Sequence, residues 1–339
     1  MHKQNLRACY VLGLILISIH TYAQDANEIQ KQKTDSIIMS YRRAAALRNP
    51  LARQGGISKE IVGRENVTSD LYGNKLSESD VRITRIRANF NLPILIKGQN
   101  AISASVNLLQ QRLDLSNTQS FNPQFPVRDM TIDKSTIIVS GNYTRFDSLF
   151  NKPVFISASI AGMTDQLVST LRLNLITLAA IQLKRTATTS YSVGFLILID
   201  PSAPTPFIPY FSYWHKFNND LELYIDLPTK LAVRKQVTKR TAVLLSSEIS
   251  GTSAFFDLKD SPLPRKDLYA TLELKTGPTF EYLVSKNIIL GVNGGLLSTL
   301  NSRMYERSAS SNDYFIKSKM GSAPYINFSI SILPFLKGF

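Results

Sequence analysis

Residues 325–339 of the chain read YINFSISILPFLKGF, and their pattern decides the fold. Between Ile326 and Ile332 an apolar side chain occupies every second position, and asparagine or serine fills the positions between. A β-strand points successive side chains to opposite faces. The segment therefore predicts a strand with one apolar and one polar face.

The same period of two recurs along the chain from about residue 80. The clearest stretches are 85–92, 102–108, 171–184, 221–227 and 270–275. Weaker candidates are 135–146, 153–162, 190–199, 207–217, 239–250 and 287–300. Turn-like segments separate many of them, for example Lys97–Asn100, and no stretch between them has the pattern of a crossover helix. We therefore expect an antiparallel all-β meander of about twelve strands.

Alternation alone leaves open which face of the sheet meets water, because soluble sandwiches and transmembrane barrels both alternate. The predicted strands run for roughly ten residues or more, as strands that cross a bilayer do. Aromatic residues near strand ends are typical of membrane-interface girdles, although they are also good strand residues. If the chain is a barrel, the charged side chains of the polar face line its lumen. They are Arg85, Arg87, Arg172, Glu222, Asp226, Glu273 and Lys275.

The first 23 residues have the organisation of a secretory signal peptide. Lys3 and Arg7 precede the apolar run 10–19, and Thr21-Tyr22-Ala23 places small residues at positions −3 and −1 of a cleavage site. The run is too short for a spanning helix, which needs about 20 apolar residues. We therefore expect export, with Gln24 as the new N-terminus.

Cleavage at that site has consequences for the chemistry of the mature chain. It removes Cys9, the single cysteine, so we expect no disulfide and no thiolate chemistry. It also leaves His215 as the sole histidine, which excludes a histidine-rich metal site. Residues 24–78 are polar and carry Pro50 and Gly55-Gly56 as breakers, so we expect an N-terminal periplasmic segment that is partly helical or loosely ordered.

The chain is strongly basic, with 39 lysines and arginines against 25 acidic residues and a formal net charge of +14. Nucleic acid is not the expected partner, because the cations are dispersed, no known binding motif occurs and export removes the chain from the cytoplasm. We expect the cations on the barrel rims to meet outer-membrane lipid and the phosphates of lipopolysaccharide.

The closing segment Tyr325–Phe339 resembles the C-terminal strand of Gram-negative outer-membrane barrels. That resemblance implies that a terminal aromatic guides insertion by the barrel assembly machinery. Phe339 would be this insertion signal. Phe335 is the alternative, because Pro334 and Lys337-Gly338 interrupt the last turn.

The layout from about residue 80 to residue 339 resembles an uncharacterised family of Gram-negative outer-membrane β-barrels with a domain of unknown function. The resemblance is carried by the signal peptide ending Ala23-Gln24, by the aromatic-rich Pro209–Trp214 and by the strand Leu221–Pro228. It implies a fold and a location, and no activity.

His215 is the residue to weigh for catalysis. Some outer-membrane lipid hydrolases use a lone histidine beside a serine and a carboxylate, and the base must lie within reach of the hydroxyl. The pattern His-x-Ser-Asn is not met, because Phe217 stands at the serine position. An interfacial histidine is the preferred interpretation, and a lipid-modifying hydrolase is the alternative.

The lumenal acids have two interpretations as well. Paired carboxylates perform acid–base work in some enzymes, but acids in a narrow lumen pair more often with arginine, since an unpaired buried charge is costly. We therefore expect Glu222, Asp226 and Glu273 to pair with the lumenal arginines. The glycines of GVNGG, 291–295, lack the lysine of a phosphate loop and mark bends or close packing instead. We expect neither metal nor cofactor.

The sequence thus predicts a single up-and-down transmembrane β-barrel over residues 79–339. A barrel of about twelve strands lies between filled eight-stranded barrels and open sixteen-stranded ones. The expected role is non-enzymatic, either a narrow, porin-like passive channel or a structural barrel in the outer membrane. The alternatives are a lipid-modifying hydrolase that depends on His215 and a secreted soluble β-sandwich.

Overall fold

The computed structural model describes residues 26–165, 172–200, 205–258 and 263–336. The predicted signal peptide, residues 1–23, and Phe339 lie outside the described residues. The chain divides into two units, Met1–Arg42 and Arg43–Phe339. The described part of the first unit is residues 26–42 of the helix α2 (Ala26–Arg48), whose last residues belong to the second unit. No helix among the described residues is long and apolar enough to cross a bilayer.

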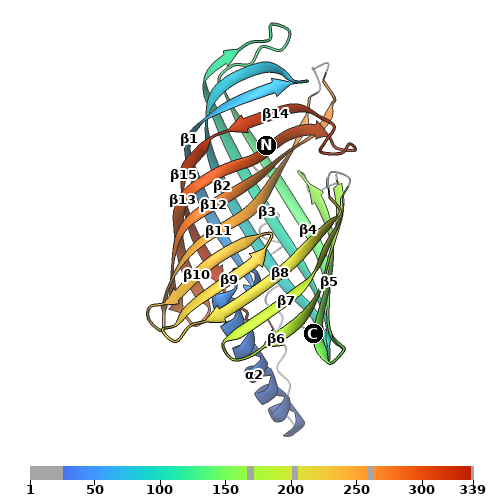
Figure 1. Ribbon diagram of the computed structural model, residues 1–339, viewed down its shortest axis with the longest axis vertical. Helices are drawn as coiled ribbons and strands as arrows, with labels where there is room; N and C mark the ends of the chain where they lie inside the picture. Colours follow the sequence, from blue (N-terminus) through green and yellow to red (C-terminus); the bar gives the residue numbers. More distant parts are fainter. Residues whose placement is uncertain (1–25, 166–171, 201–204, 259–262, 337–339) are drawn as a thin grey trace. The chain divides into compact units, whose positions relative to one another are not determined.

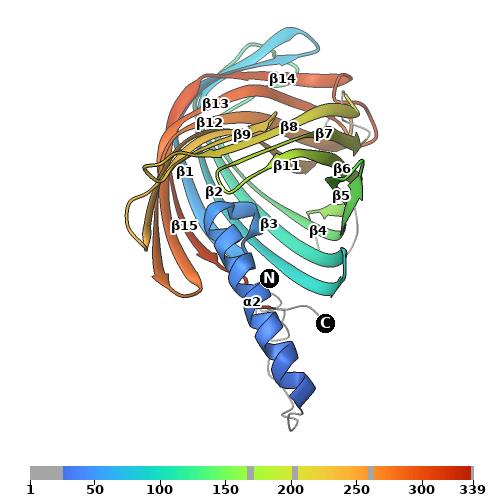
Figure 2. The same cartoon turned by 60° about the horizontal axis from the view of Figure 1, so that its bottom comes forward.

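The second unit is built from antiparallel strands that follow a short 3-10 turn, η1 (Pro50–Ala52). The strands are β1 (Gly55–Leu71), β2 (Asn74–Lys97), β3 (Asn100–Ser120), β4 (Met130–Leu149), β5 (Lys152–Thr164), β6 (Arg172–Arg185), β7 (Thr189–Ile199), β8 (Phe207–Lys216), β9 (Leu221–Leu227), β10 (Lys230–Gln236), β11 (Thr241–Asp257), β12 (Lys266–Ser285), β13 (Ile288–Glu306), β14 (Tyr314–Met320) and β15 (Ser322–Ile332). They curve into a wall that Figure 1 shows from the side and Figure 2 tilted by 60°.

The wall is closed, because every strand is paired on both sides. Neighbours in sequence pair from β1 through to β13. The strands β14 and β15 share one position, since each of them pairs with both β1 and β13 and only Gly321 separates them. Fifteen strands less one shared position give a barrel of fourteen. The all-β, antiparallel barrel is confirmed, and the expected strand count of about twelve was too low.

The strands missed in the sequence are β1, β10 and β14, and β14 shares its wall position with the predicted β15. The barrel begins at Gly55 rather than at residue 79, within the stretch expected to be a periplasmic segment. Charges on both faces of β1 hide its period, since Lys59 is exposed on one face and Glu60 is buried on the other. In β10 the inward positions are Ala232 and Arg234, so its buried face is not marked by a run of large apolar side chains.

The barrel has two ends of different character. The turn end carries the short turns, such as the one between β2 and β3, together with Gly55 and Ile332, which pair with each other. The loop end carries longer connections, such as 121–129 and 307–313. Short turns on one side and longer loops on the other match the layout of outer-membrane barrels.

The wall is much lower on one side than on the other (Figure 1). The strands β1 to β4 and β11 to β13 run for 17 to 24 residues. The strands β7 to β10 have 11, 10, 7 and 7 residues. Towards the loop end β4 therefore meets β11 directly, and the Thr136 hydroxyl donates a hydrogen bond of 2.8 Å to the Ser253 carbonyl. The upper wall narrows to the eight positions of β11 to β14 and β1 to β4.

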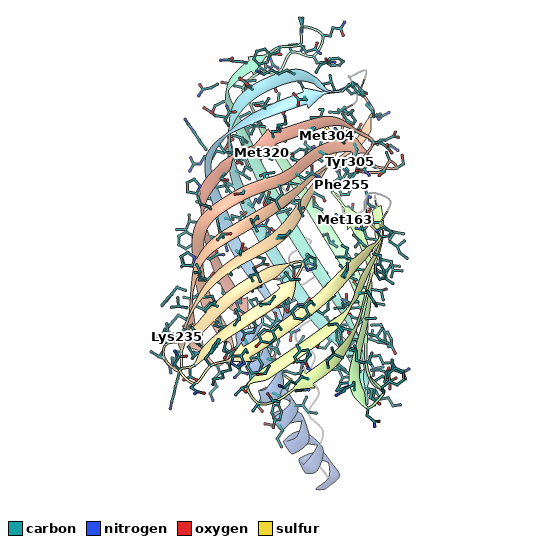
Figure 3. The ribbon with its side chains drawn as sticks, in the orientation of Figure 1. Met163, Lys235, Phe255, Met304, Tyr305 and Met320 are labelled. Atoms are coloured by element: carbon teal, nitrogen blue, oxygen red, sulfur yellow. The ribbon has the colours of Figure 1, made fainter. Side chains whose placement is uncertain are left out.

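An apolar core fills this narrow loop half. Val62, Val81 and Leu297 lie in one cluster inside it, and each is at most 2% exposed. A further cluster seals the side where β4 and β5 meet β11 to β13, and Figure 3 shows its members Met163 and Phe255 there. The interior of an eight-stranded barrel is just wide enough for side chains to fill. The loop half is thus packed like a soluble barrel.

In the wide half of the barrel at the turn end, polar side chains point inward and apolar side chains point outward. In β2 the side chains of Val81 and Ile83 point inward, but Ile86 and Phe90 point outward and Arg85 takes the inward position. The outward face of this half carries exposed apolar side chains from many strands. They include Leu92, Val106, Leu108, Val139, Ile160, Leu173, Phe195, Leu245, Val292, Phe328 and Ile330. We call this ring of outward side chains the apolar band.

Close contact between β12 and β13 explains part of the glycine-rich GVNGG stretch. A Cβ atom on Gly295 would lie 2.0 Å from the Thr276 carbonyl oxygen and 2.8 Å from the Cα of Gly277. A Cβ on Gly141 would meet nothing closer than a methyl group of Ile160 at 4.0 Å.

We therefore expect Gly295→Ala to lower the free energy of unfolding by about 1–3 kcal/mol, because the two strands must move apart. Gly141→Ala is the matched control and should change it little. Urea titration of the folded, heat-modifiable band on gels measures both. Equal midpoints for the two variants would contradict the close approach.

Candidate functional site in the barrel lumen

A layer of charged side chains crosses the lumen at the level where the inward-facing side chains change from apolar to polar. We call Glu60, Arg85, Arg87, Glu273 and Lys275 the charge layer. Arg85 donates to both carboxylate oxygens of Glu273, at 2.5 and 2.8 Å, and to Glu60 at 3.0 Å. Arg87 donates to the same Glu60 oxygen at 3.2 Å, and Lys275 pairs with the other oxygen. Arg85, Glu60 and Glu273 are each at most 2% exposed.

Strand register explains how these residues meet. Glu60 and Arg85 are direct partners in the β1–β2 pairing, so both point inward at one level. Glu273 and Lys275 come from β12, which reaches β1 only through two intervening wall positions. The bidentate contact therefore spans the interior. Such fork-like contacts are among the stronger hydrogen-bonded pairs.

The five residues of the charge layer hold three cations and two acids, and one further buried acid, Glu65, lies on the loop side of the layer beside Val81. Arg85 occupies Glu273 on both oxygens, so Glu60 alone must serve Arg85, Arg87 and Lys275. The side chain of Arg87 is the most exposed of the five, at 32%. The layer therefore presents one under-neutralised guanidinium towards the turn end.

A second polar cluster lies near the turn end. Glu222 accepts hydrogen bonds from the Trp214 indole, at 3.2 Å, and from the Tyr224 hydroxyl. Arg234 and Arg48 approach the other oxygen of Glu222 at 3.8 and 3.7 Å. This cluster ties β8, β9 and β10 to the segment that leads into the barrel.

The segment before β1, which includes Ala46 and Arg53, occupies part of the barrel opening at the turn end. Arg53 pairs with Glu281 on β12 at 2.7 Å and donates to the Ala46 carbonyl at 3.3 Å. Ala46 is fully buried against Ile289 and Leu333. Both ions of the Arg53–Glu281 pair are shielded, so the segment is anchored by charge as well as by apolar packing.

Between the mouth and the charge layer lies a cavity of about 670 Å³. Its polar lining includes Arg53, Arg87, Asn89, Asn107, Asn293 and Asn327. Arg87 is the member of the charge layer in this lining, and Ile138 and Met163 belong to the core cluster where β4 and β5 meet β11 to β13. The cavity therefore reaches the charge layer and, along β4 and β11, the lower edge of the core of the loop half.

The structure places the residues predicted to line the lumen in three groups. Arg85, Arg87, Glu273 and Lys275 meet in the charge layer. Glu222 belongs to the turn-end cluster, and Asp226 accepts a hydrogen bond from Ser212 at 2.6 Å nearby. Arg172 lies apart at the loop end, where it pairs with Asp200 and donates to the Arg307 carbonyl at 3.5 Å.

The acid that holds the charge layer together was not identified from the sequence, and neither were several residues that form ion pairs with the predicted lumenal residues. Glu60 lies on a strand that was not predicted, and Arg53 lies just before it. Arg234 lies on the short β10. The inward acids were expected to pair with Arg85, Arg87 and Arg172, but Glu222 is served by Arg234 and Arg48.

His215 lies on β8 near the turn end. Its Nδ1 atom is 2.8 Å from the Thr189 hydroxyl, and its ring stacks with Tyr213 and meets the edge of Phe217. Within the described residues, no carboxylate is hydrogen-bonded to it. A search of the described part of the chain also gives no group of three or more histidine, cysteine or acidic residues placed to hold a metal.

The turn end is strongly basic. Its exposed cations are Lys97, Lys152, Lys184, Arg185, Lys235, Lys239, Arg240 and Lys286, and Figure 3 shows Lys235 there. The described acids of the turns are few. Asp147 pairs with Arg145, and Lys216 beside Asp220 holds the pKa of that carboxyl below its usual value. At the loop end the Thr118 amide donates to Asp129 and lowers the pKa of that side chain.

These features define the class of protein: a closed antiparallel barrel of the outer-membrane type, with a polar lumen and an apolar outer band. The chain belongs to the family described as "Domain of unknown function (DUF6268)", whose model matches residues 52–332. No curated protein matches the chain.

Three solved structures are similar in outline. The COG4313 outer membrane channel from Pseudomonas putida F1 is 7% identical, over 83% of this chain and 96% of that one, at a TM-score of 0.36. The outer membrane protease OmpT from Escherichia coli is 11% identical, over 83% and 95%, at 0.20. The transport unit of the autotransporter AIDA-I from Escherichia coli is 8% identical, over 88% and 98%, at 0.26. Scores this low carry no argument about function.

The charge layer allows a direct test of its role in stability. Glu273→Leu leaves the buried Arg85 with one shared acid, so we expect a loss of about 3–5 kcal/mol in the free energy of unfolding. The exposed pair Arg145–Asp147 supplies the control, and Asp147→Asn should cost no more than about 1 kcal/mol. Fluorescence of Trp214, the single tryptophan, reports unfolding in urea.

A double variant separates lost pairing from lost volume. Arg85→Met combined with Glu273→Leu removes both charges, and we expect it to recover most of the stability lost in Glu273→Leu. If the double variant is less stable than the single one, the contact across the lumen is not what the stability depends on.

Proposed function

We propose that the protein is a non-enzymatic barrel of the Gram-negative outer membrane whose lumen is closed to steady flow. The proposal is supported by one observation: the apolar side chains point outward in one half of the barrel and inward in the other. An apolar outer band surrounds the wide half, and a packed core with a charge layer beneath it fills the narrow half. Such a molecule is better suited to a structural or gated role than to a passive pore.

The apolar band supports placement in a bilayer. A closed barrel leaves no lipid-exposed backbone unpaired along its paired strands, and a transmembrane barrel turns apolar side chains outward. Above the band the outer surface becomes polar, with Arg64, Arg82 and Arg112 exposed. In this proposal the turn end, where the first barrel strand begins and the last one ends, faces the periplasm. The loop half projects beyond the outer leaflet.

The charges of the two ends support the proposed partners. The basic turn end faces anionic phospholipid head groups, and arginines above the band face lipopolysaccharide phosphates. Phe335 follows β15 and is 41% exposed, so it is available as the insertion signal for the barrel assembly machinery. Phe339, the other candidate, lies outside the described residues.

The surroundings of His215 support a non-enzymatic role. Its Nδ1 atom is engaged by Thr189, and two aromatic rings pack against it. This is the environment of an interfacial aromatic belt, where amphipathic rings are enriched. The lumenal acids that we described are paired with cations or hydroxyl groups, which suits structure better than proton transfer.

The membrane placement predicts where an added charge is tolerated. Leu223→Arg and Leu272→Arg put a cation on the lipid-facing side. Leu272→Arg should cost roughly 2–4 kcal/mol, as near the bilayer midplane, whereas Leu223→Arg, at the level of its strand partner His215, should cost about 1 kcal/mol. Asn66→Arg is the control, because Asn66 is exposed above the band beside Asp80. Folding into phospholipid vesicles, read by the heat-modifiable band, measures all three. Equal folding yields would contradict the placement.

The closed lumen predicts little conductance. In planar bilayers we expect the wild-type barrel to show no steady ohmic current, because the core of the loop half blocks the axis. The same preparation must show the fast-migrating folded band on a gel, so that an absence of current cannot result from misfolding. A steady single-channel conductance in folded protein would contradict closure.

A further inference from the structure

The low side of the barrel leaves an opening in the wall. The hairpin of β9 and β10 ends at Leu227–Lys230, opposite Phe211 on β8 and Glu248 on β11. Both neighbouring strands continue beyond the hairpin, β8 as Phe207–Tyr210 and β11 from Ser250 onward. We call the gap above the hairpin the side window, and Figure 1 shows the short β9 and β10 next to the tall β11.

The side window lies at the depth of the apolar band. Exposed apolar side chains surround it, with Leu227 at its base, Phe207 on β8 and Leu272 on β12, each between 42% and 48% exposed. Above it the wall closes again, where Thr136 donates to Ser253 and Met163 packs against Phe255. The opening therefore faces the lipid rather than the aqueous phase outside.

On the side of β11 the cavity extends past the level of the charge layer and reaches this window, since Ser250 is the strand partner of Glu273. Gly251, Thr252 and Ser253 on the unpaired edge of β11 line it, as does Lys230 at the tip of the hairpin. An open sheet edge at membrane depth is tolerated only where it lines a filled or protein-enclosed space. The edge thus needs an occupant of the cavity, either water or a bound molecule.

The far side of the same cavity offers an anion site. Arg87 lines the cavity from β2, and its one acidic partner, Glu60, is shared with Arg85 and Lys275. A guanidinium with free donors binds carboxylate or phosphate with a matching planar geometry. Asn89 and Asn107 lie beside it in the lining and add hydrogen-bonding groups.

We propose that the cavity binds a single-chain anionic amphiphile, which enters through the side window from the membrane. Its head group pairs with Arg87, and its chain runs back to the window and the apolar band. The volume of about 670 Å³ is within the range of small-molecule sites. This inference rests on the membrane placement proposed above, but not on the absence of conductance.

Cis-parinaric acid, a fluorescent fatty acid, tests the proposal with full-length folded protein in maltoside micelles. We expect saturable binding at one site per barrel. Arg87→Gln should weaken it roughly tenfold or more, because a charged hydrogen bond is lost, and Arg87→Lys should restore much of it. Arg112→Gln, which removes an exposed arginine above the band, is the control and should bind like wild type.

A second pair of variants tests the route. Gly251→Phe adds a ring on the lipid-facing side of the window edge, where its strand partner Leu272 lies, and a new Cβ there meets nothing closer than the Thr271 carbonyl at 3.4 Å. It should slow association several-fold, whereas Gly141→Phe, on the outer face of β4, should not. Absence of saturable binding to folded wild type, or binding unchanged in Arg87→Gln, overturns the site. Unchanged association in Gly251→Phe overturns the route, and acetate that competes as well as a long-chain acid shows that the chain is not recognised.

Discussion

The contact of Arg85 with Glu273 across the lumen is the interaction on which the two halves of this barrel depend. It joins β2 to β12 over three intervening wall positions, at the level where the inward-facing side chains change from apolar to polar. On the loop side the interior is mainly apolar, with Glu65 and Asp267 buried in it, and the outer face is polar. On the turn side the interior is polar and the outer face apolar. A buried ion pair is poor evidence for stability in itself, but here it caps the apolar core and gives the polar cavity a floor of fixed charge.

Unequal strand length is what allows both halves to coexist. A barrel of fourteen equal strands has an interior too wide for side chains to fill, since eight strands are about the limit. Because β7 to β10 stop early, β4 and β11 come into contact and the remaining positions close a narrower ring. Side chains of the wall itself fill the interior of that ring, so no separate plug domain is needed to fill it. The consequence is a wall with one low side, where the edge of β11 has no strand beside it.

Local alternation was enough to predict strands, antiparallel order and the inward facing of Arg85, Arg87 and Glu273, because each depends on a period of two. It did not predict the change of facing, although the sequence carries the signal. In VRITRIRANFNL, residues 81–92, the apolar phase runs through Val81 and Ile83 and then shifts by one to Ile86 and Phe90. Partners were harder to predict, because Glu60 lies on the unpredicted strand β1 and Glu273 meets Arg85 only through the closure of the barrel, which no local pattern encodes.

The unpaired edge of β11 gives the low side a physical requirement. In water such an edge invites another strand, and in a bilayer its polar groups have no solvent. Part of the edge is satisfied within the protein, since Thr136 donates to the Ser253 carbonyl and Arg307 donates to the Phe256 carbonyl at 3.0 Å. The stretch below them borders the cavity, where Arg87 stands with a shared counter-ion. An amphiphile meets both requirements together, because its chain covers the opening on the lipid side and its head group supplies the negative charge that the charge layer lacks.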